Sequence, residues 1–176
     1  DKLRHYQQRP PERQFIDGEL QPFMGEHYPL HIIHESQRQR LHVQFDQHKF
    51  LIMAPASASS IQIRQALARW YRHQAEALLT ARVKQLAKHT GLQPNQVQIK
   101  SYKSRWGSCN IRGDIQLNWQ LVQATQPISD YVIIHELCHL QQHNHSKAFW
   151  QLVEQFDPNY RQHRGWLKNH GHQLVI

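Results

Sequence analysis

Cysteine and long apolar runs are both scarce in this chain. Its 176 residues include only two cysteines, Cys109 and Cys138, which are too few for a disulfide scaffold and favour a reducing cytoplasm. No stretch approaches the roughly 18 apolar residues that a membrane-spanning helix needs. A content of 39% hydrophobic and 19% charged residues is typical of a globular protein, and the length predicts one domain with its own core.

Acidic residues are also in the minority. Lys and Arg number 21 against 13 for Asp and Glu, which gives a formal net charge of +8. This excess could attract a nucleotide or a nucleic acid. No run of consecutive bases occurs, however, so a solvated basic face explains the charge equally well.

Hydrophobic periodicity and turn signals divide the chain into three segments and predict an α+β fold. Residues 1–14 are polar with paired prolines and should form an irregular lead-in. Residues 15–55 contain short strand-like segments separated by turn signals such as Asp17-Gly18, which predicts a small β-rich lobe of antiparallel hairpins. Residues 56–176 should form the core and pack with the lobe into one compact unit.

Helical spacing prevails after residue 55. Apolar residues such as Leu67 and Tyr71 recur at that spacing between a group of serines and Gly91, so one long helix should run from about 59 to 89. Trp70 and Tyr71 should face the core. The other expected elements are a strand through "QVQIKSYKSRWGSC", a strand in "GDIQLNW", and helices at about 129–142, 147–156 and 160–169.

The stretch "DYVIIHELCHLQQHNHSKAFW", residues 130–150, carries the strongest chemical signal. His135, Glu136 and His139 form the pattern H-E-x-x-H, and positions i and i+4 of a helix share one face, so both imidazoles can reach an ion about 2.0–2.1 Å away. A chain this rich in histidine shows the bare pattern by chance about once in twenty. The apolar "YVII" before the pattern favours a real site, because it can bury a neutral imidazole.

A catalytic zinc needs a third protein ligand, and His145 is placed to provide it. His145 follows His139 by six residues, which is the separation found in H-E-x-x-H-x-x-G-x-x-H metallopeptidases. Gln142 stands where that pattern has glycine. We therefore expect the turn to use Asn144, which tolerates left-handed geometry, and we predict His135, His139 and His145 as the metal ligands.

Other third ligands deserve comparison. His143 would continue the helical stripe, but it would lie about 12 Å from His135 at 1.5 Å per residue and could not share an ion with it. Glu154 is an alternative because some zincins take a glutamate from a following helix. Cys109 could bind as an inhibitory thiolate.

Glu136 is the expected catalytic residue. Three neutral imidazoles leave zinc with its full double charge, which lowers the pKa of a bound water towards about 7. Glu136 could accept the proton of that water and pass it to the leaving group. Its replacement should therefore abolish turnover and spare metal binding.

Four longer stretches resemble a known family. They are "SYKSRWGSCN" (101–110), "GDIQLNWQLV" (113–122), "ISDYVIIHELCHL" (128–140) and "NHSKAFWQLVEQFDPNY" (144–160). Together with "FIDGELQPFMGEHYPLHI" near the N-terminus, they resemble the YgjP-like family of metal-dependent hydrolases over essentially residues 15–176.

The resemblance implies a zincin-like metallopeptidase core over residues 56–176, related to SprT-like and Wss-type proteases. It implies zinc bound by His135, His139 and His145, with Glu136 as the catalytic residue and a protein or peptide as substrate. Members have also been described as UTP pyrophosphatases, which makes a nucleotide phosphoanhydride the second candidate substrate. Phosphate hydrolysis usually employs Mg²⁺ held by carboxylates, whereas three histidines suit zinc.

Basic residues suggest two further roles. Arg105 or Lys103 could stabilise an oxyanion or bind phosphate, although cationic strand residues are usually solvated. A third hypothesis is docking of the long helix on a nucleic-acid backbone. The bases concerned are Arg64, Arg69, Arg72, Arg82, Lys84 and Lys88.

For several residues near the motif we expect a structural role and no part in the chemistry. Asn118 should bond buried backbone at the end of its strand, and Asp130 should cap the helix that carries the motif. Cys138 should pack away from the ligand face. Phe149 and Trp150 should be core residues that hold the segment bearing His145.

Overall fold

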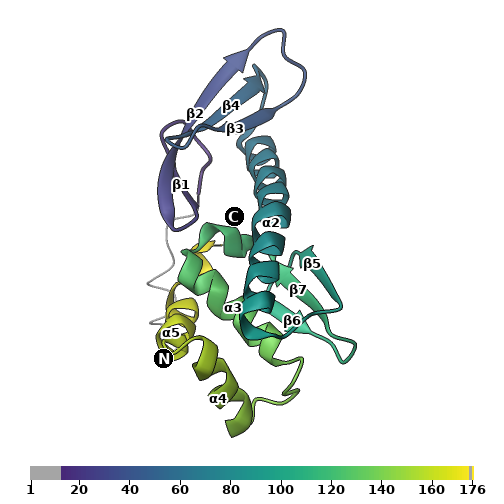
Figure 1. Ribbon diagram of the computed structural model, residues 1–176. Coiled ribbons are helices and arrows are strands. Elements are labelled where there is room, and N and C mark those ends of the chain that lie inside the picture. The colour runs from purple at the N-terminus through teal and green to yellow at the C-terminus, as the bar shows by residue number, and fades with distance from the viewer. Residues whose placement is uncertain (1–12, 175) are drawn as a thin grey trace.

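The computed structural model describes residues 13–174 and 176, and it places a β-sheet and a three-helix assembly at opposite ends of one long helix (Figure 1). The expected lead-in therefore lies mostly outside the described residues. The long helix, α2 (Ser60–Thr90), has the predicted ends. Ser59 caps it through a reciprocal capping box with Gln62, and Gly91 ends it with a φ of 74° that favours glycine.

The N-terminal sheet contains β1 (Leu20–Phe23), β2 (Glu26–Glu35), β3 (His42–Phe45) and β4 (Phe50–Pro55) in the order β1-β2-β4-β3. The prediction of a purely antiparallel lobe was wrong, because β2 and β4 pair in parallel. The most apolar strand takes the centre: β4 buries Phe50, Ile52 and Ala54 on one face.

The strand-like segment "QFI", just before the Asp17-Gly18 turn, does not form a strand. Phe15 adopts a φ of 56°, outside the strand region. The backbone N–H groups of Gln14 and Phe15 donate instead to the carboxylate of Glu19. This local competition turns the chain before β1 begins.

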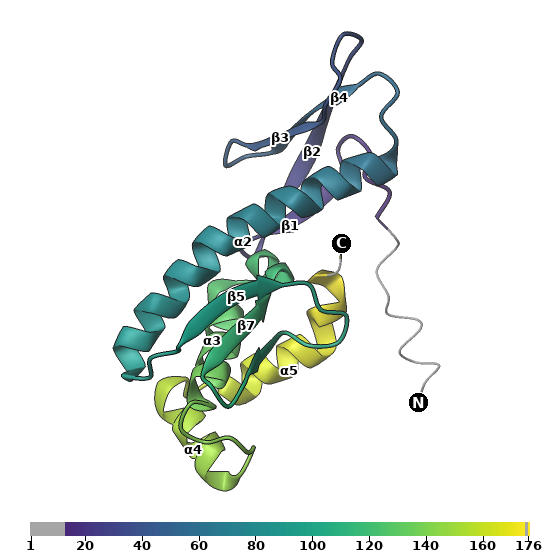
Figure 2. The same cartoon turned by 90° about the vertical axis from the view of Figure 1, so that its right-hand side faces the viewer.

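The second sheet contains β5 (Gln96–Lys100), β6 (Gly107–Cys109) and β7 (Asp114–Asn118) in the order β5-β7-β6. β5 lies alongside α2 (Figure 2). The expected continuous strand is broken between residues 100 and 107, because the buried Asn118 Nδ2 donates to the carbonyls of Tyr102 and Arg105. The expectation for Asn118 is thus confirmed, and its bonds shape the loop that leads into β6.

The remaining elements are η1 (Trp119–Gln123), α3 (Gln126–Cys138), α4 (Lys147–Phe156), α5 (Tyr160–His170) and η2 (Gly171–Leu174). α4 and α5 agree with their predictions, whereas α3 begins and ends earlier than expected. Pro127 in its first turn suits a helix start. The role predicted for Asp130 as a cap was wrong, since its carboxylate accepts two 2.7 Å hydrogen bonds from Arg82 on α2.

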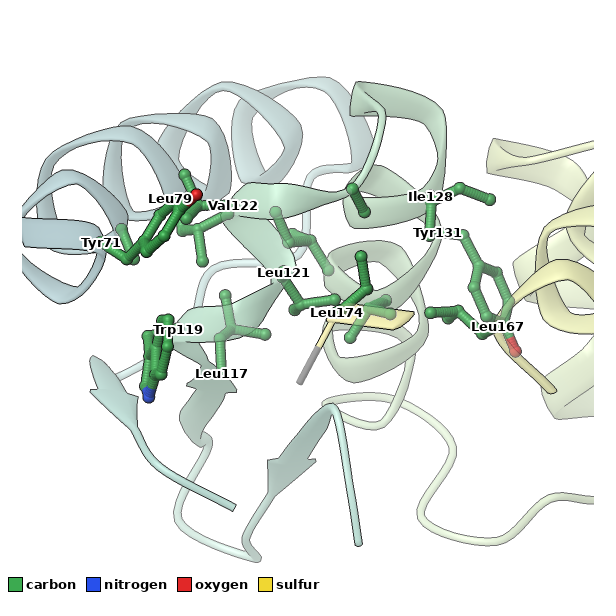
Figure 3. Packing of buried hydrophobic residues seen from close by; sticks show 14 of the residues in the cluster. Tyr71, Leu79, Leu117, Trp119, Leu121, Val122, Ile128, Tyr131, Leu167 and Leu174 are labelled. Carbon is green, nitrogen blue, oxygen red and sulfur yellow. The ribbon is translucent and has the colours of Figure 1, made fainter. Parts of the chain in front are cut away.

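One buried apolar cluster runs through the lobe, α2 and the helices. Tyr71 is fully buried, as predicted, and donates a 2.6 Å hydrogen bond to the carbonyl of Pro22 in β1. Its ring stacks on Trp119 at 6.1 Å, and Figure 3 shows Tyr71 beside Leu79 and Val122. The elements form the α+β class that the sequence predicted, while the boundary near residue 55 stays a prediction.

None of the helices in the described part of the chain combines the length and the apolar character that crossing a bilayer requires.

Candidate metal centre

Helix α3 carries His135 and His139 on one face. The hydrogen-bonded helix ends at Cys138, but His139 keeps helical dihedral angles, φ −64° and ψ −18°. The i, i+4 relationship therefore survives the early helix end, and the two ring centroids are 4.9 Å apart.

His145 reaches the same point from the segment between α3 and α4. Its Nε2 lies 3.0 Å from Nε2 of His135 and 3.1 Å from Nε2 of His139. One ligand atom from each of the three residues lies within 4.8 Å of the others. The three histidines singled out from the sequence thus converge.

The turn between His139 and His145 needs no left-handed residue, so the role expected for Asn144 was wrong. Among the described residues, positive φ outside glycine occurs only at Phe15, Met24 and Gln47. The segment closes through Nδ1 of His139, 3.0 Å from the carbonyl of Gln142. The segment thus closes without a glycine at position 142.

The donor set fits a zinc ion. A carbonyl can only accept, so Nδ1 of His139 carries the proton and its Nε2 presents a lone pair to the centre. Zinc–nitrogen bonds of about 2.0–2.1 Å in a tetrahedron place the nitrogens about 3.3 Å apart, close to the 3.0 and 3.1 Å observed. A cation bound between the three Nε2 atoms would accept their lone pairs.

Aromatic packing holds the imidazoles in place. The ring of Phe149, fully buried as predicted, lies 4.9, 4.4 and 4.9 Å from the rings of His135, His139 and His145. Trp150 stacks on His145 at 5.7 Å and 24°. Nδ1 of His135 is buried without a hydrogen bond to the described residues, so packing orients that ring.

Burial favours the neutral form of the two imidazoles that α3 carries. Burial, followed by the neighbouring imidazoles, lowers the pKa of His135 to about 3. Burial also lowers the pKa of His139. Neutral imidazole is the form that binds metal, so burial favours the metal-binding form of His135 and His139.

Glu136 lies beside the cluster with 6% of its surface exposed. Burial raises the pKa of its carboxyl to about 8, and the charge of Arg105 opposes that rise. Its carboxylate packs against Gly107 of β6, where a Cβ would stand 2.7 Å from Oε1. The absence of a side chain at position 107 therefore leaves the space that the carboxylate occupies.

Arg105 is exposed, and its guanidinium lies 5.1 Å from the centre of the Tyr102 ring. Its influence on Glu136 places its charge near the site, although it does not line the adjacent cavity. Lys103 is exposed in the same loop.

The alternative ligands lie elsewhere. His143 is exposed and outside the histidine cluster. Glu154 forms an ion pair with Arg161 at 3.2 Å. Cys109 is half-buried outside the cluster, and burial raises the pKa of its thiol to about 11. Cys138 is fully buried, which confirms its expected role in packing.

A cavity of about 300 Å³ opens beside His135 and Glu136. Trp106 and Gly107 near β6 complete its wall together with helix residues that the sequence reasoning missed: Tyr131, Val132, Arg164, Leu167 and Lys168. Tyr131 could have been found, because it precedes His135 by one helical turn on the same face. The α5 residues give no such local signal.

The helix bases considered for nucleic-acid docking are partly engaged within the molecule. Arg82 binds Asp130, Arg64 donates to the carbonyl of Ile176 at 2.9 Å, and Arg72 lies 5.5 Å from the Trp119 ring. Docking on nucleic acid stays a prediction.

A convergent histidine cluster beside a buried glutamate, on an α+β framework, is typical of a metal-dependent hydrolase. The chain belongs to the family described as YgjP-like, metallopeptidase domain, which it matches over residues 1–170.

Two individual proteins are similar to parts of the chain. UTP pyrophosphatase from Escherichia coli (strain K12) is 32% identical over 56 residues, which cover 32% of this chain and 34% of that protein, so the match spans about a third of the length of this curated relative. The crystal structure of the metallopeptidase zymogen of Pyrococcus abyssi abylysin is 24% identical with a TM-score of 0.46, over 51% of this chain and 93% of that one.

Proposed function

We propose that the protein is a zinc-dependent peptidase in which His135, His139 and His145 bind the metal and Glu136 is the general base. The observation that carries the proposal is the convergence of three imidazole side chains beside the buried carboxylate of Glu136, which lines a cavity together with His135. Membership of a metallopeptidase-domain family supports peptide bonds as the substrate.

Zinc bound there would supply a Lewis acid that polarises a carbonyl and acidifies water. Glu136 would accept a proton from the attacking water at a carboxylate oxygen and deliver it to the departing amine. Burial makes this carboxyl a stronger base than a solvated one, since the pKa is raised to about 8. Part of that rise would be lost beside a bound cation, because opposite charge favours the carboxylate.

Residues around the reacting groups would orient them. Phe149 packs beneath the three imidazoles, and Gly107 leaves room for the carboxylate of Glu136. Tyr131 and Trp106 line the cavity and would exclude water from the bound substrate. Arg105 is the candidate for stabilising negative charge that develops near Glu136.

A second candidate is hydrolysis of a nucleoside triphosphate. It is supported by the partial match to UTP pyrophosphatase and by the basic residues Arg164 and Lys168 at the cavity. The donor set favours the first candidate, since Glu136 is the one carboxylate among the described residues that line the cavity. Mg²⁺ sites for phosphate transfer rely on carboxylate oxygen.

The test measures zinc by mass spectrometry in wild type, His145→Ala, Glu136→Gln and His143→Ala. We expect about one zinc per chain, lost only in His145→Ala, because His143 is exposed and outside the cluster. Casein cleavage should disappear in His145→Ala and Glu136→Gln and persist in His143→Ala. UTP hydrolysis with that same pattern of losses, in place of casein cleavage, would establish the second candidate.

A further inference from the structure

The cavity beside the histidine cluster has an apolar body and a cationic edge. Trp106, Tyr131 and Leu167 supply aromatic and aliphatic surface, and Figure 3 shows the ring of Tyr131 on α3 extending towards Leu167 on α5. A volume of about 300 Å³ is at the small end of ligand sites. It suits a single substrate side chain better than a large ligand.

Two basic residues of α5 line this cavity. Arg164 and Lys168 are four residues apart, so they share one face of the helix, and Leu167 is buried between them. Neither forms an ion pair with a described residue, whereas Arg161 on the same helix binds Glu154. Their charges are therefore available to a ligand.

Aromatic packing holds Arg164 close to the metal centre. Its guanidinium lies 4.8 Å from the centre of the Trp150 ring, and Trp150 stacks on His145. The charge of Arg164 also acts on His135 and on Tyr131. A planar guanidinium held in this way is arranged to bind a carboxylate through two hydrogen bonds.

Charge is unbalanced in the cavity. The described lining contains two cations and one carboxylate, Glu136, which the proposed reaction uses as a base. A substrate carboxylate would meet opposite charge from both cations, whereas a substrate ammonium group would meet like charge.

We infer that this cavity receives a substrate carboxylate next to the scissile bond, with Arg164 and Lys168 as the specificity-determining residues. The carboxylate comes from an acidic side chain or from the C-terminus of a short peptide. The inference rests on the proposed peptidase function and names the substrate class on which that function acts.

The first experiment uses two series of quenched fluorescent peptides. One series carries Glu, Gln or Lys at the residue before the scissile bond, and the other carries them at the residue after it. At one of the two positions, wild type should cleave the Glu peptide about tenfold faster in kcat/KM than the Gln peptide, as expected for a charge-assisted hydrogen bond. The Lys peptide should be cleaved slowest. A pair with free or amidated C-termini distinguishes the two sources of the carboxylate.

The variants are Arg164→Gln, Lys168→Gln and their combination, with Arg161→Gln as a control on the same helix. The double variant should bring the Glu-to-Gln ratio close to one, mainly through slower cleavage of the Glu peptide, while its zinc content stays near wild type. Arg161→Gln should keep the wild-type ratio. A purely structural role for the two cations would lower cleavage of all peptides together and would overturn the inference.

Binding gives a readout that is independent of turnover. In fluorescence anisotropy, Glu136→Gln should bind the Glu peptide about tenfold more tightly than the Gln peptide. Combining Glu136→Gln with Arg164→Gln and Lys168→Gln should remove this difference. Cleavage of the peptides without any preference for a carboxylate would refute the inference alone, whereas cleavage of none of them would refute the peptidase function. If UTP displaced the Glu peptide at a lower concentration than unlabelled peptide does, Arg164 and Lys168 would be phosphate-binding residues, and the inference would be overturned.

Discussion

Gly107 lies directly against the carboxylate of Glu136: an added Cβ would stand 2.7 Å from Oε1 and 2.8 Å from Cγ. A residue of β6 thus leaves room for a side chain on α3, and it can do so only while it lacks a side chain of its own. Tertiary contact, rather than the helix alone, directs the proposed base.

Gly107→Ala should therefore displace Glu136 without removing a metal ligand. We expect kcat/KM for peptide cleavage to fall by about 100-fold, the cost of misplacing a catalytic group by roughly 1 Å, while zinc content stays at the wild-type level. Gly165→Ala is the control, because a Cβ there meets no atom within 4 Å in helix α5. Full activity in Gly107→Ala would show that the carboxylate needs no such support.

Phe149 is expected to set zinc affinity through packing. Phe149→Leu keeps an apolar side chain but removes the flat ring that contacts all three imidazoles. We predict about tenfold weaker zinc binding, as found when support of ligands is lost, measured by competition with a chromophoric chelator. Phe156→Leu, at the far end of the same helix and away from the cluster, should leave affinity unchanged.

Asn118 should be a determinant of stability. Asn118→Ala would leave the carbonyls of Tyr102 and Arg105 without their donor, at a cost of about 3 kcal/mol in the free energy of unfolding. Urea denaturation measures this loss, with Asn169→Ala on the exposed face of α5 as a neutral control. Equal midpoints for the two variants would contradict the assigned role.

Metal removal should destabilise the native protein. A ligand that binds only the folded state stabilises it by about 2.7 kcal/mol at 100 times its Kd, so a chelator should lower the Tm and added zinc should restore it. His143→Ala should respond like wild type, whereas His145→Ala should show no zinc-dependent change in Tm. Equal zinc responses in both variants would exclude His145 as a ligand.

Arg82 and Asp130 should couple α2 to α3. Their side chains are 31% and 18% exposed, so a double-mutant cycle with Arg82→Gln and Asp130→Asn should yield about 1 kcal/mol of interaction energy. High salt should reduce that energy only in part, because the pair is half-buried. An additive cycle would show that the pair contributes nothing to stability.

The sequence by itself determined the features that depend on local chemistry. Ser59 and Gly91 marked the ends of α2, and the i, i+4 spacing of His135 and His139 predicted their shared face, because helix caps and side-chain directions depend on neighbouring residues. The convergence of His145 also followed from spacing.

Only the tertiary structure decided the features that depend on distant partners. β4 took the centre of the first sheet in parallel with β2, since burial of its apolar face outweighs chain order. The strand ends at residue 100 because the side chain of Asn118 donates hydrogen bonds to the carbonyls of Tyr102 and Arg105. Arg164 reached the cavity beside the metal centre because α5 packs against α3, a contact between residues that no local pattern relates.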